Sequence, residues 1–239
     1  MRRAAGAREY LDGRVPPADL ASTLADLDRL NAWFGGHALS LARVRRVAAA
    51  APPERTLCIV DVGGGDGAFA RRVACWARRA GRRVRVLVID DDEATARLAT
   101  AECAAYPEIV VLRADATALP LAAGAADVVH AALTLHHLEP GDAVAALSEM
   151  RRACRGRLVV NDLARTPLAL GLVWLATRVL PMHPMSRHDG PLSVRRAYAP
   201  SELGDLFGAA GVTRTRVTRY PWLARLVVEA THPQGGPST

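Results

Sequence analysis

Short apolar runs alternate along the chain with longer segments whose apolar residues recur every three or four positions. Five runs rich in β-branched residues are typical of buried parallel strands, and they begin at Leu57, Val84, Ile109, Ala126 and Arg157. Helical periodicity covers residues 18–33, 38–50, 68–80, 142–154, 168–180 and 200–211. Because the links are short, this alternation predicts an α/β fold with a doubly wound parallel sheet and helices on both faces.

The end of the chain departs from the alternation. Residues 212–220 and 222–230 resemble two strands joined at Pro221, which predicts an antiparallel terminal hairpin and brings the sheet to seven strands. Residues 163–199 are predicted to be irregular apart from the apolar helix 168–180. The last residues, 233–239, are expected to form a disordered tail.

A glycine-rich loop follows the first strand. The segment from Asp61 to Gly67 reads D-V-G-G-G-D-G, and an apolar helical pattern begins directly after it. Glycine accepts positive φ and lets the backbone approach a ligand, and the following helix offers free N–H groups. A dinucleotide fingerprint would require a third glycine three residues after Gly65, which the loop lacks, so the spacing disfavours a nicotinamide oxidoreductase.

Acidic residues follow the next two strands. Asp90 ends the second strand about 20 residues beyond the glycine loop, which is where a carboxylate can accept hydrogen bonds from ribose hydroxyls. Asp91 is the alternative for that contact, and it also suits the N-terminus of the next helix. Asp115 and Ala116 follow the third strand.

These motifs, in this order, resemble the class I S-adenosylmethionine (SAM)-dependent methyltransferases over residues 57–230. The sequences of these motifs are similar to those of ubiquinone and menaquinone biosynthesis methyltransferases and of bacterial secondary-metabolite O-methyltransferases. The resemblance implies a Rossmann-like sheet with an antiparallel last strand and SAM as cofactor. It implies that Asp115 and Ala116 hold the adenine, and that the cofactor-binding residues are Asp61, Gly63, Gly64, Gly65, Gly67, Asp90, Asp91, Asp115 and Ala116.

The loop H-H-L-E-P follows the fourth strand, at the edge of the sheet where such folds bind ligands. A histidine there could deprotonate a hydroxyl of the acceptor. Comparison with plant O-methyltransferases favours His136 as the base, and comparison with quinone-type enzymes favours His137. A metal-dependent mechanism is disfavoured, because Asn161 and Asp162 end the fifth strand but no further carboxylate ends the fourth.

We expect a methyltransferase domain over residues 51–232, with residues 1–50 forming a helical lid and residues 164–199 a second lid or substrate-binding insertion. The substrate pocket is expected to be apolar, and the helix at 168–180 also suits contact with a membrane surface. The candidate substrate-contacting residues are Trp33, Phe34, Trp174, Met185 and His188.

The amino-acid composition bears on which kind of partner the protein binds. The formal charge of +7 would suit nucleic acid, but every basic residue is arginine and none is lysine, which indicates compositional bias. No RNA-binding module is visible, so we expect a small-molecule substrate and no nucleic acid. The four cysteines are scattered without a C-x-x-C pair and no apolar leader follows the N-terminus, which favours a cytoplasmic protein.

The resulting hypothesis is O-methylation of a small aromatic, polyketide-derived or quinol-type molecule. Two alternatives remain at this point: C-methylation of a quinone or polyketide ring, and a catalytically silent binding subunit. A protein or RNA methyltransferase is disfavoured, since the chain has no N-P-P-Y-type site.

Overall fold

A seven-stranded sheet with the order β3-β2-β1-β4-β5-β7-β6 forms the centre of the computed structural model, which describes residues 1–231. The predicted disordered tail lies outside the described residues. The strands are β1 (Leu57–Val62), β2 (Val84–Asp90), β3 (Ile109–Arg113), β4 (Ala126–Ala132), β5 (Cys154–Leu163), β6 (Thr215–Tyr220) and β7 (Arg225–Thr231). The helices are α1 (Pro17–Trp33), α2 (Gly36–Ala49), α3 (Ala68–Arg79), α4 (Glu93–Glu102), α5 (Pro140–Ala153), α6 (Pro167–Val179), α7 (Pro184–Arg196) and α8 (Pro200–Ala209), with single turns η1 (Tyr10–Asp12), η2 (Leu135–His137) and η3 (Pro221–Leu223).

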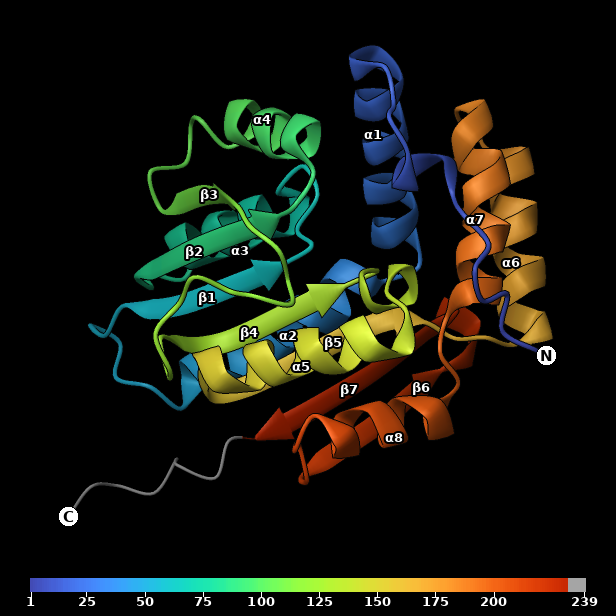
Figure 1. Cartoon of the computed structure of the whole chain (residues 1–239). Helices are drawn as coiled ribbons and strands as arrows, with labels where there is room; N and C mark the ends of the chain where they lie inside the picture. The colour runs from blue at the N-terminus through green and yellow to red at the C-terminus, as the bar shows by residue number, and fades with distance from the viewer. Residues whose placement is uncertain (232–239) are drawn as a thin grey trace.

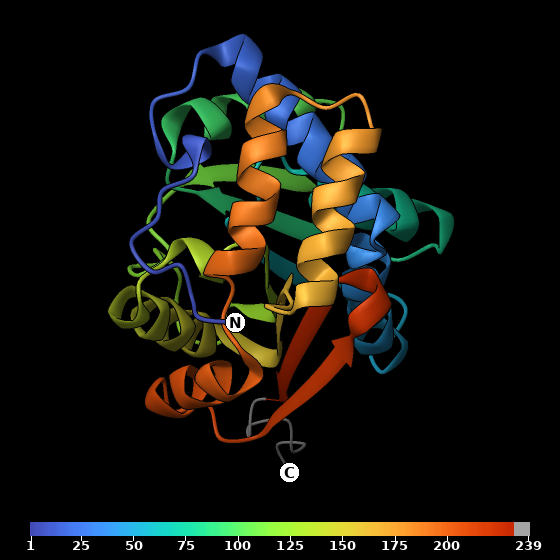
Figure 2. The same ribbon diagram turned by 90° about the vertical axis from the view of Figure 1, so that its right-hand side faces the viewer.

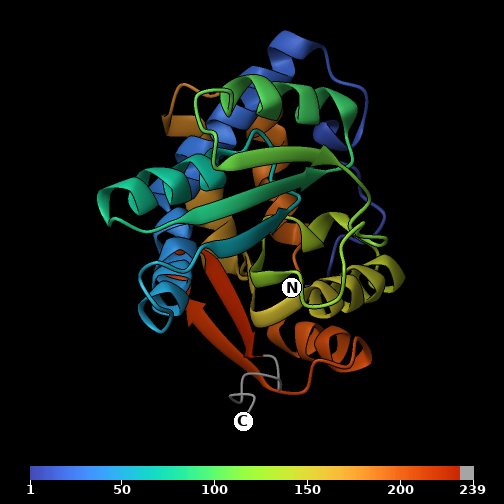
Figure 3. The ribbon, with the colours of Figure 1, turned by 90° about the vertical axis from the view of Figure 1, so that its left-hand side faces the viewer.

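The strand directions confirm the predicted sheet. Strands β1 to β5 are parallel, whereas β7 runs antiparallel between β5 and β6, with Val228 paired to Val160 on one side and to Val217 on the other. Figure 3 shows β3 at one edge of the sheet and the β6–β7 hairpin toward the other.

Alternate side chains of the central strands fill two cores. Ile59 of β1 packs with Val44 of α2 and Val73 of α3 on one face of the sheet. Val60 of the same strand packs with Leu147 of α5 and Phe207 of α8 on the opposite face. These layers are visible in Figure 1, and they follow from the period of two along a buried strand. Helix α2 therefore belongs to the core that covers the sheet.

Helices α1, α6 and α7 stand beyond the carboxyl ends of the parallel strands (Figures 1 and 2). Helix α7 corrects the sequence analysis, which treated this segment as irregular because of its prolines. Pro191 lies inside α7 and has no N–H for the carbonyl of Arg187, and the Arg178 side chain donates to that carbonyl instead, at 3.1 Å. A Cβ at Gly190 would lie 3.0 Å from Thr177 Cγ2, so glycine allows α6 and α7 to pack closely.

The apolar helix α6 ends at Val179 after 13 residues. Among residues 1–231, no helix combines the length and apolar character needed to cross a bilayer.

Candidate active site

The glycine loop turns the chain from β1 into α3 against the end of β2. The N–H groups of Gly63 and Gly64 donate to the Ile89 carbonyl at 2.8 and 3.0 Å. Gly63 has a φ of +65°, and a Cβ there would meet Thr134 at 2.5 Å. Gly65 also has positive φ (+56°), but around its missing Cβ only Leu24 comes within 4 Å, at 3.8 Å, so its backbone borders open space.

Two other glycines of the loop face the protein. A Cβ at Gly64 would meet Val88 at 2.7 Å, and one at Gly67 would meet Cys103 Sγ at 2.6 Å. Gly64 still borders the cavity described below, whereas Gly67 does not. In the structure Gly67, with a φ of +76°, turns and packs the loop away from the cavity.

Asp90 ends β2 directly opposite the glycine loop. Its carboxylate accepts hydrogen bonds from the N–H of Gly65 at 3.0 Å and from the N–H of Asp92 at 3.2 Å. Burial raises the pKa of Asp90 to about 6, although these two hydrogen bonds act to lower it. Asp90 thus supplies a desolvated carboxylate beside the open backbone of Gly65.

Asp61 is held by a buried polar chain. Its carboxylate lies 2.7 Å from Nδ1 of His130 on the neighbouring strand β4, and His130 Nε2 lies 2.8 Å from Ser40 Oγ of α2. The amide of Asn161 on β5 donates to Ser40 Oγ at 2.9 Å, so the chain crosses three strands of the sheet. Asp61 and His130 both border the cavity.

One cavity of about 900 Å³ lies over the carboxyl ends of β1, β2 and β4. It is lined by eight of the nine predicted cofactor-binding residues, the exception being Gly67. Asp115 accepts hydrogen bonds from both the N–H and the hydroxyl of Thr117, at 2.7 and 2.8 Å, which fixes the turn after β3. We call the part formed by Gly65, Asp90 and Asp115 the cofactor side.

The two candidate catalytic histidines occupy different positions. His136 is buried, with Nδ1 donating to Asp162 Oδ1 at 2.7 Å and the backbone N–H donating to Asp162 Oδ2 at 3.3 Å. Burial acts to raise the pKa of Asp162, but the neighbouring His136 outweighs it and the pKa is lowered. His136 does not border the cavity, and its ring centroid lies 4.3 Å from that of His137.

His137 does border the cavity. Its Nδ1 lies 2.7 Å from Asp12 Oδ1, and Arg196 of α7 donates both to Asp12 Oδ2 and to the His137 carbonyl. We call His137, Asp12 and Arg196 the acceptor side. The N-terminal residues 6–8 and 11–13 and helix α1 complete this part of the lining.

None of the five predicted substrate-contacting residues borders the cavity. The side chains of Trp33 and Trp174 are 69% and 50% exposed. Phe34 packs with the small apolar cluster between α6 and η3, and Met185 lies on α7 near Thr23 of α1. His188 is half-exposed and pairs with Asp189 at 2.8 Å. Their large side chains led to the prediction that they line the substrate pocket, but in the structure they lie on the outer surface or pack between helices.

Sequence reasoning missed four polar residues that the fold brings to the site: Glu9, Asp12, His130 and Arg196. Glu9 and Asp12 precede the first helical stripe and carry no motif, and Arg196 falls in the segment predicted to be irregular. His130 occupies an inward position of β4, where a buried histidine could have signalled a polar network. Burial raises the pKa of Glu9, although His137, Ser193 and Arg196 act to lower it.

The sequence is similar to known methyltransferases. Residues 59–156 match the family model described as a methyltransferase domain. Probable S-adenosylmethionine-dependent methyltransferases of two Mycobacterium tuberculosis strains are 30% identical over 134 residues, covering 56% of this chain and 43% of those proteins. The chain thus spans less than half the length of these curated relatives.

The fold has solved counterparts. A SAM-dependent methyltransferase from Aquifex aeolicus superposes with a TM-score of 0.61 at 19% identity, covering 92% of this chain and all of that one. Magnesium protoporphyrin IX methyltransferase from Synechocystis PCC 6803, solved with bound S-adenosylhomocysteine (SAH), gives 0.56 at 20% identity, covering 83% and 84%. Over residues 59–156 the chain thus matches the methyltransferase domain family, and its fold is shared with solved SAM-dependent methyltransferases.

Proposed function

We propose that the protein transfers a methyl group from SAM to a hydroxyl of a small aromatic, polyketide-derived or quinol-type molecule. The observation that carries the proposal is that the cofactor side and the acceptor side border one and the same cavity of about 900 Å³. This volume is at the upper end of the range for small-molecule sites, about 300–1,000 Å³, and suits a cofactor together with an acceptor.

The cofactor side fits SAM. The open space at Gly65 leaves room for a ligand against the loop, and the carboxylate of Asp90 can accept hydrogen bonds from ribose hydroxyls. Asp91 is the alternative for that contact, and Asp115 with Ala116 would hold the adenine, as in the family. When bound, SAM supplies an activated methyl group to a nucleophile placed in line with it. Orienting the two reactants can contribute about 7–11 kcal/mol to lowering the barrier.

The acceptor side supplies the proton chemistry. A phenolic hydroxyl has a pKa of about 10, so it must lose its proton as the new O–CH₃ bond forms. His137 borders the cavity, and the His136 ring lies next to it. General-base assistance contributes roughly 10²–10⁴-fold to a rate. Asp12 and Asp162 hold the Nδ1 atoms of the two rings and leave the Nε2 atoms for this role.

Helix α1 and the N-terminal segment are the parts of the chain best placed to act as a lid. Leu20, Leu24 and Leu27 of α1 border the cavity, whereas α6 and α7 contribute only Arg196. We expect SAH and an acceptor to slow amide hydrogen exchange in residues 6–33. Unchanged exchange there in the ternary complex would rule out closure.

The reaction is tested by incubating the full chain with SAM and a panel of phenols and quinols. Mass spectrometry should show a product heavier by one methyl group together with SAH. The position of the methyl group on oxygen or carbon, read by NMR of the product, separates O-methylation from C-methylation. SAM binding without turnover across the panel would instead favour the silent binding subunit.

A further inference from the structure

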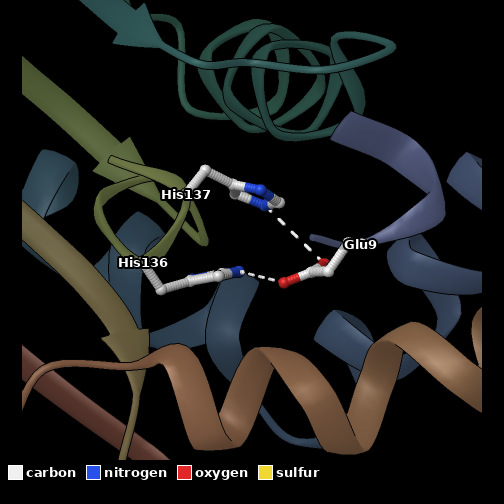
Figure 4. A group of neighbouring side chains, drawn as sticks. All are labelled: Glu9, His136 and His137. Carbon is white, nitrogen blue, oxygen red and sulfur yellow. Dashed lines mark ion pairs between the residues drawn. The ribbon is translucent and has the colours of Figure 1, made fainter. Parts of the chain in front are cut away.

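Three side chains from two distant parts of the chain converge beside the cavity. Glu9 lies in the N-terminal segment just before η1, and His136 and His137 lie in η2 after β4. Nε2 of His136 is 3.8 Å from Oε1 of Glu9, and Nε2 of His137 is 4.0 Å from Oε2. Figure 4 shows both rings turned toward the carboxylate. These distances exceed hydrogen-bonding range.

Each histidine is oriented by a carboxylate on its other nitrogen. Nδ1 of His136 lies 2.7 Å from Asp162, and Nδ1 of His137 lies 2.7 Å from Asp12. A carboxylate on Nδ1 fixes the tautomer whose Nε2 carries a lone pair, and this is the arrangement in which histidines bind metal ions. The third side chain is also held, since Glu9 accepts hydrogen bonds from Ser193 Oγ at 2.8 Å and from Arg196 at 3.2 Å.

His130 provides an internal comparison. Both of its ring nitrogens have close partners, Asp61 at 2.7 Å and Ser40 at 2.8 Å, so its hydrogen-bonding capacity is used. His136 and His137 have close partners on Nδ1, while their Nε2 atoms point at one shared carboxylate. Among residues 1–231, the trio Glu9, His136 and His137 is the one group of candidate ligand atoms that lie within 4.8 Å of one another.

The local charges also favour a cation. Glu9, Asp12 and Asp162 are three carboxylates, and the guanidinium groups acting on them belong to Arg196 and Arg225. With neutral histidines the group carries a net negative charge. Glu9 and His136 are almost fully buried, where an uncompensated charge is costly.

We propose that Glu9, His136 and His137 bind a divalent transition-metal ion of the zinc type. Two nitrogen ligands and one carboxylate are the donor set of catalytic His₂Glu zinc sites, which keep a further position for water or substrate. Ligand atoms on a tetrahedral zinc are about 3.4 Å apart, so the histidine–glutamate distances of 3.8 and 4.0 Å would each close by roughly half an ångström. His137 connects the site to the cavity, where the open position would take an oxygen donor such as a hydroxyl or carbonyl.

This site gives the two histidines a role other than general base, because a metal ion acidifies the hydroxyl that it binds. It also departs from the sequence-based expectation of a metal-free enzyme, which weighed only Asn161 and Asp162. The inference does not depend on methyl transfer, since it concerns metal binding by the protein alone.

The test is calorimetric titration of Zn²⁺ into the full chain, prepared without a histidine tag and stripped with a chelator. We expect one equivalent to bind with micromolar or tighter affinity. Glu9→Gln and His137→Ala should each weaken binding at least tenfold, and Asp162→Asn should weaken it about 10–100-fold through His136. His188→Ala is the matched control, because it removes a histidine paired with a carboxylate outside the trio, and it should bind zinc as the parent does.

Circular dichroism identifies any variant that fails to fold. His137→Ala is the ligand substitution least expected to disturb folding, because the His137 side chain is 30% exposed. Absence of saturable zinc binding to the folded parent would overturn the proposal, and so would binding that a folded His137→Ala retains. Cobalt substitution provides a second readout, since Co²⁺ in this site should give visible absorption that the same variants lose.

Discussion

The two sides of the cavity are built in different ways. The cofactor side consists of backbone turns and strand-end carboxylates within 57–116, a continuous quarter of the chain. The acceptor side joins His137 after β4 to Asp12 near the N-terminus and to Arg196 at the end of α7, so its residues are up to 184 positions apart. Under the proposed function, cofactor binding therefore depends on local backbone geometry, whereas acceptor chemistry depends on the packing of α1, α6 and α7 over the sheet.

The largest effect should come from filling the open space at Gly65. Gly65→Val places a branched side chain where the cofactor would lie, on a residue with a φ of +56° that β-branched residues avoid. We expect calorimetry to detect no SAH binding to a folded variant. Gly141→Ala is the control, because nothing lies within 4 Å of the added Cβ and Gly141 does not border the cavity. Normal SAH affinity in Gly65→Val would place the cofactor elsewhere.

A change on the acceptor side should separate turnover from cofactor binding. His137→Ala should lower kcat by roughly 10²–10⁴-fold while SAH affinity stays within about twofold, because the ring faces the acceptor. His188→Ala should leave both quantities near the parent values, since the structure places that side chain outside the cavity. If His137→Ala weakens SAH binding as much as it slows turnover, the two sides are not independent.

Asp90 should make cofactor binding depend on pH. Burial raises its pKa to about 6, and the ionised carboxylate is the form that accepts hydrogen bonds from ribose. SAH affinity should therefore fall as the pH drops below about 6. Asp90→Asn should bind more weakly at neutral pH, by about 1–3 kcal/mol, and should lose this pH dependence. An unchanged pH profile in Asp90→Asn would assign the dependence to another group.

Asp90 should also make the free energy of unfolding of the ligand-free protein depend on pH. A carboxyl whose pKa is raised on folding stabilises the fold most below its ordinary value of 3.8, and this contribution is lost as the pH rises through about 6. Urea unfolding of the parent and of Asp90→Asn, compared at acidic and neutral pH, measures the difference.

The smallest effect should come from the outer face of α6. Trp174, Leu175 and Val179 are 50–73% exposed, and we propose that this face contacts a membrane surface. Trp174→Ala should reduce co-sedimentation with anionic vesicles several-fold while turnover of a soluble acceptor stays unchanged. Equal co-sedimentation of the parent and Trp174→Ala would contradict contact between this face and a membrane.

The same contrast explains how much could be predicted from sequence. The strand starts, the hairpin and the cofactor side could be predicted from local patterns. A buried apolar run that ends in D-V-G-G-G-D-G by itself predicts a strand, a tight turn and a following helix. Helix α7 was missed because proline argues against a helix locally, and only the Arg178 side chain, brought by α6, satisfies the Arg187 carbonyl. Glu9, Asp12 and Arg196 were missed for the same reason, because their meeting is a property of tertiary packing.

The measurement that tests the central claim most directly is calorimetric titration of SAH and of NAD into the unmodified chain. The glycine loop, Asp90 and the 900 Å³ cavity predict one equivalent of SAH bound with micromolar affinity and no detectable NAD binding. Tight NAD binding without SAH binding would contradict the assignment of this cavity to SAM.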